Sequence, residues 1–286
     1  MKTSATLAGF IAIALWSCLA LLTAASGTMP PFQLAAVTFA IGGALGLAYA
    51  GWRGRLAALR QPWPVWLLGV GGLFGYHALY FAALRAAPPA EAGLIAYLWP
   101  LLIVLLSALL PGEHLRARHV LGALCGLAGV GVLMFGPRLW RGEGFGLELR
   151  FASGYGLAFL CAFVWSIYSV LSRRFRDVPT EAVAGFCLAT AALAGLSHLA
   201  LEPDVWPQDP GQWLAVLGLG LGPVGLAFYV WDVGVKHGDI RLLGVASYAA
   251  PVLSTLVLVA AGFAQASWAL AVACGLIVAG ALVAAL

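Results

Sequence analysis

Aromatic side chains that carry a polar atom lie deep inside long apolar segments of this sequence. Aromatic faces suit flat apolar groups, and they also attract an ammonium group by the cation–π effect. A hydroxyl or imidazole in hydrocarbon is costly without a partner, so these side chains should face a protein interior or a watered cavity. We assign the following residues to a substrate-binding cavity for a small organic solute: Trp165, Trp16, Tyr76, Tyr80, Tyr97, Trp99, His77, Tyr168, Tyr229, Tyr248 and Ser166.

Spacing relates some of these residues to one another. Tyr76 and Tyr80 are four residues apart, so on a helix they share a face. Trp16 and Trp165 fall near the middle of their segments, and Trp165 is the first choice for substrate contact. The alternative for each tyrosine is a hydrogen bond to a neighbouring helix within the core. His77 is either a proton carrier near neutral pH or a hydrogen-bonded residue of the core or cavity.

Charge is missing from the centres of the apolar segments. The nearest charged residue, Asp232, precedes Lys236 by four positions, a spacing that predicts a structural ion pair on one helix. A carrier of phosphate compounds would be expected to hold cations at its site, whereas a zwitterion can place its carboxylate on backbone N–H groups of a broken helix. The sequence has no metal-ligand spacing, and we predict neither a metal nor a cofactor.

The composition dictates the environment of these segments. The chain has 286 residues, of which 63% are hydrophobic, with only 15 basic and 11 acidic side chains. A soluble enzyme, a secreted disulfide scaffold and a nucleic-acid binder are excluded, because no compact soluble fold could bury so much apolar surface. A bilayer span needs about 20 residues. We therefore predict an all-α integral membrane protein with transmembrane helices near 5–25, 31–51, 64–84, 90–110, 118–136, 153–173, 180–201, 212–235, 240–262 and 266–286.

The basic residues predict the orientation of the helices. Most of them fall in the loops that share a side with the N-terminus, such as 53–60, 116–118 and 173–176. The loop 202–209 has acidic residues and no basic one. By the positive-inside rule, both termini should be cytoplasmic.

The two halves of the sequence resemble each other. Trp16-Ser17 recurs as Trp165-Ser166, and the segment from Tyr80 to Pro100 recurs from Trp231 to Pro251. We predict two five-helix repeats, 1–144 and 145–286, and because five is odd the second is inverted. Inverted repeats are typical of alternating-access transporters whose site lies at the repeat interface. Prolines and glycines near the predicted breaks and gates complete the set of gating or hinge residues, which are Pro100, Pro251, Gly93, Gly244, Pro223 and Trp231.

The ten segments, the repeat and one stretch of sequence resemble the drug/metabolite transporter superfamily in its EamA-type branch. The stretch has Pro100 in the fourth segment, Glu113 in the loop after it, and Gly122, Gly126 and Gly129 in the fifth. The second half departs from this pattern, since Ala264 or Gln265 stands at the position of the loop Glu. Within the superfamily the aromatic interior is most similar to amino-acid exporters of the YddG type.

The resemblance and the residues together predict a secondary transporter of a bacterial inner membrane. Its partners would be the lipid bilayer and a small-molecule substrate, a neutral or aromatic amino acid, with no nucleic acid, and it would be a monomer or a homodimer. Export of another small metabolite or drug-like solute is the alternative. An integral membrane enzyme acting on lipid is a weaker one, because such chemistry usually needs clustered Asp, Glu or His residues.

Overall fold

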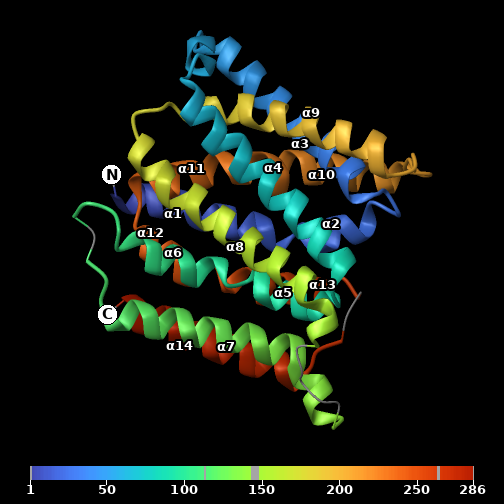
Figure 1. Cartoon of the computed structure of the whole chain (residues 1–286), viewed down its shortest axis with the longest axis vertical. Helices are drawn as coiled ribbons and strands as arrows, with labels where there is room; N and C mark the ends of the chain where they lie inside the picture. The colour runs from blue at the N-terminus through green and yellow to red at the C-terminus, as the bar shows by residue number, and fades with distance from the viewer. Residues whose placement is uncertain (1, 113, 143–147, 263–264, 286) are drawn as a thin grey trace.

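The computed structural model describes residues 2–112, 114–142, 148–262 and 265–285, and it is helical in these ranges (Figure 1). Four one-turn elements are η1 (Leu56–Leu59), η2 (Leu149–Phe151), η3 (Arg173–Phe175) and the π-helical η4 (Gly222–Leu226). The α-helices are α1 (Lys2–Ser17), α2 (Leu19–Ala25), α3 (Pro31–Trp52), α4 (Trp63–Ala86), α5 (Pro89–Ala96), α6 (Trp99–Ser107), α7 (Ala117–Trp140), α8 (Ala152–Ser172), α9 (Ala182–Leu201), α10 (Pro210–Leu221), α11 (Ala227–His237), α12 (Ile240–Ala246), α13 (Ala249–Ala260) and α14 (Trp268–Ala285).

These elements form the ten predicted membrane spans. Eight helical segments of the described chain are long and apolar enough to cross a membrane, and two shorter apolar helices, Glu91–Ser107 and Trp268–Ala284, fill the remaining predicted positions. The expected all-α fold is therefore confirmed. The junction of the predicted repeats, between residues 144 and 145, lies outside the described residues, as does Glu113.

Four of the spans are interrupted. The fourth and ninth break between α5 and α6 and between α12 and α13, close before Pro100 and Pro251, and the eighth has the π-helical turn η4 around Pro223. Proline lacks the N–H that would continue the helical hydrogen-bond ladder, which explains these breaks. The first span breaks at Cys18, where no proline stands. There the Ser17 hydroxyl donates to the Ala14 carbonyl (2.6 Å), a bond that competes with regular helix geometry.

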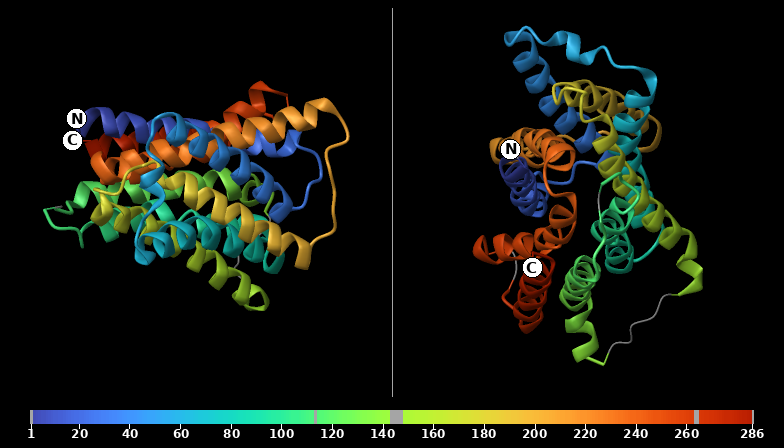
Figure 2. Two further views of the ribbon diagram at one scale, coloured as in Figure 1. Left: turned by 90° about the horizontal axis from the view of Figure 1, so that it is seen from above. Right: turned by 90° about the vertical axis from the view of Figure 1, so that its left-hand side faces the viewer.

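Helices of one half pack mainly on helices of the other. α7 lies along α14, α3 along α9, α4 along α8 and α1 along α11, as the α7–α14 and α3–α9 pairs at opposite edges of the bundle show clearly (Figure 1). Small residues allow these close contacts. A Cβ placed on Gly122 of α7 would lie 2.5 Å from the Gly280 carbonyl oxygen of α14, so only glycine fits there. The two halves thus form one body with a shared interior (Figure 2).

Polar contacts tie the loops together at each end of the bundle. At the end that holds both termini, here called the termini side, Lys2 pairs with Asp239 (3.3 Å) and Arg241 donates to the His114 carbonyl. At the other end, here called the Glu202 side, the buried Glu202 carboxylate accepts hydrogen bonds from Arg85 (2.8 Å) and from the backbone of Phe32 (3.0 Å) at the start of α3. A carboxylate at a helix N-terminus satisfies N–H groups that have no partner within the helix.

Candidate functional site: a central aromatic cavity

A cavity of about 560 Å³ lies at the centre of the bundle, among the first, third, fourth, sixth, eighth and ninth spans. Seven of the predicted cavity residues line it, and they are Trp16, Tyr76, His77, Tyr80, Tyr97, Trp99 and Trp165. The lining also includes Leu19, Ala20, Thr23, Ala24, Pro223, Val224, Phe228, Ala250 and Ser254. No charged side chain is in this lining among the described residues. The cavity can therefore accept a small, largely apolar molecule.

Four indole rings form a cluster at the end of the cavity that is nearer the termini side. Trp16 of α1 and Trp165 of α8, which are equivalent in the repeat, meet edge to face with centroids 5.8 Å apart. Trp99 lies 6.3 Å from each of them. Trp231 stacks on Trp165 at 6.3 Å, is fully buried and donates from its indole nitrogen to the Ser169 hydroxyl (3.2 Å). Three indole rings thus face the cavity, and the fourth, that of Trp231, is buried behind them toward the termini side.

The interruption of the eighth span contributes to this cluster. In η4 the Pro223 carbonyl accepts a hydrogen bond from the Trp16 indole nitrogen (3.1 Å). The contact holds the Trp16 ring against the wall of the cavity and gives a partner to a carbonyl in an irregular turn. Non-helical backbone at this depth is tolerated only where protein or a cavity covers it.

Tyrosines form part of the cavity wall next to the tryptophans, toward the Glu202 side. Tyr76 and Tyr80 of α4 stack with ring centroids 6.0 Å apart, as their spacing predicted, and Tyr76 also lies 5.3 Å from Trp165. Tyr97 approaches from the break between α5 and α6. Their three hydroxyl groups have no hydrogen-bond partner within the described ranges, and none of them is sealed from the cavity. They can therefore donate to a carboxylate.

His77 sits beside these tyrosines. Its Nδ1 is 2.7 Å from the Leu73 carbonyl oxygen on the preceding turn of α4. Aromatic rings surround it, with Phe39 at 5.1 Å, Tyr76 at 5.3 Å and Phe81 at 6.0 Å between centroids. The structure thus shows His77 as a cavity residue that is hydrogen-bonded through one ring nitrogen.

Three of the predicted cavity residues are buried on the termini side of the cavity. The Tyr168 ring packs on Gly72, and the Tyr248 hydroxyl accepts a hydrogen bond from the backbone N–H of Leu101 (3.2 Å). Ser166 donates to the Trp99 carbonyl (3.0 Å). Together with Trp231 they close this side of the cavity, so they do not line it in the present conformation.

Tyr229 corrects one expectation. It was predicted to line the substrate-binding cavity, but its hydroxyl donates to the Gly42 carbonyl of α3 (3.0 Å), and it lines a separate lateral pocket with Arg55 and Glu181. Tyr229 and Trp231 are two residues apart, and side chains at that spacing leave a helix on nearly opposite sides. Tyr229 therefore faces away from the central cavity.

The predicted hinge glycines lie within helices and not at the breaks. Gly93 is inside α5 and Gly244 inside α12, three or four residues before the interruptions. A Cβ on Gly244 would lie 2.9 Å from the Val104 side chain and 3.2 Å from the Pro100 carbonyl oxygen. This glycine permits close contact between α12 and α6, so in the present conformation it acts through packing.

Several residues of the site were missed by the analysis of the sequence. Phe228 lines the cavity and stacks on Phe39 with centroids 5.3 Å apart. Phe228 lies one helical turn before Trp231, which was predicted to be a gating residue, and this spacing was a usable signal. Thr23 and Ser254 supply hydroxyls near the mouth of the cavity. Isolated hydroxyls are common in membrane helices, so no pattern singled them out.

The Asp232–Lys236 ion pair is confirmed. The Lys236 Nζ lies 2.9 Å from the Asp232 carboxylate, and both side chains are buried. Thr180 also donates to the carboxylate (2.7 Å), and Lys236 donates to the Val178 carbonyl (2.9 Å). The pair thus fastens α11 to the segment before α9. Among the residues that the structure describes, no group of three His, Cys, Asp or Glu side chains could hold a metal ion.

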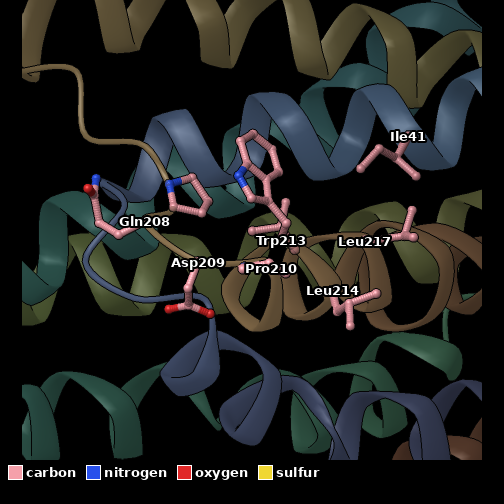
Figure 3. Close-up of a pocket in the computed structure, with 9 residues that line it drawn as sticks. Ile41, Gln208, Asp209, Pro210, Trp213, Leu214 and Leu217 are labelled. Carbon is pink, nitrogen blue, oxygen red and sulfur yellow. The ribbon is translucent and has the colours of Figure 1, made fainter.

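Another hollow lies on the outside of the bundle, where α10 meets α3 (Figure 3). Trp213, Leu214, Leu217 and Ile41 make it apolar, and Gln208 and Asp209 stand at its edge in the loop before α10. Asp209 accepts from the backbone of Gln212 (3.0 Å) and so caps α10. None of the predicted site residues lies in this hollow, and its polar side chains bond locally, since Gln208 donates to the Trp206 carbonyl (2.7 Å).

Comparison with known proteins places this architecture in a family. The profile of the EamA-like transporter family matches residues 3–135 and again 152–286. The chain belongs to this family, and it is a membrane transporter protein, not an enzyme.

Individual relatives agree with this assignment. The chain is 64% identical over 286 residues to a protein of Ancylobacter novellus named aromatic amino acid exporter YddG, covering all of this chain and 98% of that one. Proteins of the same name from Salmonella typhimurium and Escherichia coli are 30% and 28% identical, over 88% and 89% of this chain. A solved crystal structure that shares 64% identity superimposes with a TM-score of 0.94, covering 99% of this chain and 97% of that one.

Proposed function

We propose that this protein exports aromatic and other neutral amino acids across a bacterial inner membrane by alternating access. The observation that carries the proposal is the central cavity, whose walls are aromatic and without charge in the described chain. A flat side chain would lie against the indoles of Trp16, Trp99 and Trp165. The names of the relatives that it resembles support the same substrate class.

The tyrosines suit the carboxylate of such a substrate. Hydrogen bonds to a charged acceptor are about twice as strong as neutral ones, so hydroxyls of Tyr76, Tyr80 and Tyr97 can hold a carboxylate without a cation. The absence of a central Lys or Arg then favours zwitterions over phosphorylated or acidic solutes. The residues that line the cavity all come from one chain, so the proposed transport needs no second copy.

The conformation fits one state of an alternating-access cycle. The cavity is closed on the termini side by Trp231, Tyr168 and Tyr248, which are at most 2% exposed. Toward the Glu202 side its lining continues to Thr23 and Ala24, which are exposed. With cytoplasmic termini, as the basic loops predict, this is the outward-open state.

Cysteine labelling in intact cells tests the orientation. Cysteines placed at Arg55 or Arg174, on the termini side, should react with an impermeant reagent only after the membrane is opened, and one at Asp204 should react from outside. Arg55 and Asp204 lie in loops, and Arg174 lies in the one-turn element η3 at the very end of the sixth span, so folding should be preserved. The reverse pattern would overturn the orientation and the outward-open assignment.

Transport by purified protein in proteoliposomes tests the function. Phenylalanine, tryptophan, leucine, alanine, glutamate and a sugar phosphate should be compared, with and without a proton gradient. We expect uptake of the neutral amino acids, with larger apolar or aromatic side chains favoured. Preferential transport of glutamate or the sugar phosphate would refute the proposal. Since no carboxylate lines the described cavity, we expect no strict requirement for a proton gradient.

A further inference from the structure

The hydrogen bond of His77 determines which of its ring nitrogens carries the proton. Nδ1 lies 2.7 Å from the Leu73 carbonyl oxygen, and a carbonyl oxygen can only accept. Nδ1 must therefore carry the hydrogen and donate it. In a neutral imidazole the other nitrogen, Nε2, is then a bare acceptor.

The surroundings of His77 favour the neutral ring. Its neighbours are the rings of Phe39, Tyr76, Phe81 and Phe228, all with centroids within 6.3 Å. No carboxylate contacts the ring in the described parts of the chain. A charged imidazolium in such a place would lose hydration without gaining an ion pair.

The free nitrogen of His77 faces the cavity. His77 lines the cavity, its Nε2 has no hydrogen-bond partner among the described residues, and the atom is not sealed inside protein. No Asp or Glu side chain joins it in this lining. Indole N–H groups only donate, so Nε2 and the amphoteric hydroxyl oxygens are the side-chain acceptors that the cavity offers.

We infer that His77 Nε2 accepts a hydrogen bond from the ammonium group of the substrate and thereby selects amino acids over analogues without that group. The inference rests on the proposed function and deepens it. The face of Tyr76, next to His77, adds cation–π attraction for the same group. The tyrosine hydroxyls would take the carboxylate, so opposite ends of the zwitterion meet different residues of the cavity.

Two ligands separate ammonium recognition from recognition of the ring and carboxylate. L-Phenylalanine and 3-phenylpropionate differ only in the ammonium group. Their binding to purified protein should be measured by calorimetry for the wild type, His77→Phe and His77→Gln, with His237→Phe as an exposed control for the same change. His77→Phe keeps a flat ring and removes both nitrogens, whereas His77→Gln restores an acceptor oxygen.

We expect His77→Phe to weaken phenylalanine binding about tenfold or more, the range of a charge-assisted hydrogen bond, and to leave 3-phenylpropionate binding nearly unchanged. His77→Gln should recover part of the loss, and His237→Phe should lose nothing. If His77→Phe weakened both ligands equally, or neither, the inference would be wrong. If the wild type bound no aromatic amino acid, the proposed function itself would fail, whatever His77 does.

Nitrogen NMR of ¹⁵N-histidine-labelled protein is a second test of the inference, and it does not depend on the His77→Phe variant. His77 is assigned by the signal lost in His77→Gln. Its Nδ1 should be protonated and its Nε2 bare, and phenylalanine but not 3-phenylpropionate should shift the Nε2 signal. A protonated Nε2 in the free protein, or no shift with phenylalanine, would overturn the inference.

Discussion

Trp165 contacts more aromatic rings than the other residues that line the cavity, and a substrate ring could pack against the same cluster. It packs against Tyr76, Trp16, Trp99 and Tyr168 with centroids 5.3 to 6.3 Å apart, yet it still lines the cavity. An aromatic pair contributes about 1 kcal/mol beyond area burial. Trp165→Ala should therefore lower transport of phenylalanine about fivefold more than transport of alanine, because only phenylalanine has a ring that contacts the Trp165 indole.

The measurement is uptake into proteoliposomes, normalised to the amount of folded protein that each preparation contains. Trp52→Ala is the matched control, since Trp52 is 80% exposed at the end of α3 and far from the cavity. Equal loss for phenylalanine and alanine would mean that Trp165 only supports the packing of the bundle.

The Asp232–Lys236 pair is a structural feature that substitution can test separately from transport. Removal of one partner leaves an uncompensated buried charge, which typically destabilises a protein by about 3–5 kcal/mol. Lys236→Met should therefore lower the thermal unfolding temperature in detergent strongly. The double variant Asp232→Leu with Lys236→Met removes both charges and should recover most of the stability. A double variant as unstable as the single one would contradict this explanation.

At the level of residues, the sequence predicted contacts between positions that are equivalent in the two repeats. It did not predict on which face of its helix a given side chain lies. Trp16 and Trp165 meet because they occupy equivalent positions in two repeats that pack on each other. Tyr229 is different, because its direction from α11 follows from a rotation about the helix axis. The irregular turn η4 ends at Leu226, three residues before Tyr229, so helical periodicity alone does not fix that rotation.

Among the elements, the interrupted helices carry most of the site. Trp16 and Trp99 sit next to breaks, and η4 supplies the carbonyl that fixes Trp16. Three of the breaks could be predicted from Pro100, Pro223 and Pro251, since the effect of proline on a helix is local. The break at Cys18 could not, because the same Trp-Ser pair in α8 leaves that helix continuous.

Two equivalent glycines in α7 and α14 have different surroundings. A Cβ on Gly126 would lie 2.4 Å from the Tyr248 ring, whereas a Cβ on its repeat equivalent, Gly275, would have no described atom within 4 Å. Gly126→Ala should therefore disfavour the present conformation, in which the termini side is closed. Gly275→Ala should leave it unchanged, and alanine should even favour the helix by up to about 1 kcal/mol.

Labelling of a cysteine at Ser254, which lines the cavity, reports the open state. We expect slower labelling in the Gly126→Ala background and no slowing in the Gly275→Ala background, with thermal unfolding measured on both to exclude general loss of structure. The two glycine variants are each other's control, because the chemical change is identical. Equal labelling in both backgrounds would show that the contact with Tyr248 does not affect the equilibrium.

The whole molecule has two related halves in unequal conformations. The family profile matches both halves, and their helices pair across the repeat, yet among the described residues the cavity lining reaches the exposed Thr23 and Ala24 toward the Glu202 side, whereas Trp231 and Tyr168 are buried toward the termini side. The ten spans and their approximate ends were accessible from composition and hydrophobic pattern. The open side was not, because an alternating-access protein uses one sequence for two states, whose difference is set by small packing and hydrogen-bond energies.

The hydrogen bond between Tyr248 and Leu101 is one interaction that contributes to this difference between the two states. The Leu101 N–H lies in the first turn of α6, where it lacks a helical partner, and the Tyr248 hydroxyl accepts from it at 3.2 Å. In the repeat, Tyr97 corresponds to Tyr248 and Val252 to Leu101. When the cavity opens to the termini side instead, Tyr97 should accept from the Val252 N–H in the first turn of α13.

Removal of either hydroxyl should then shift the equilibrium in opposite directions. A hydrogen bond of this kind contributes about 1 kcal/mol, a roughly fivefold change in the ratio of the two states. Tyr248→Phe should slow the labelling of a cysteine at Ser254 by weakening the present closure, and Tyr97→Phe should increase it by weakening the opposite one. The measurement is made without substrate, because Tyr97 also lines the cavity. A shift of the same sign in both variants would rule out an exchange of equivalent hydrogen bonds between the two states.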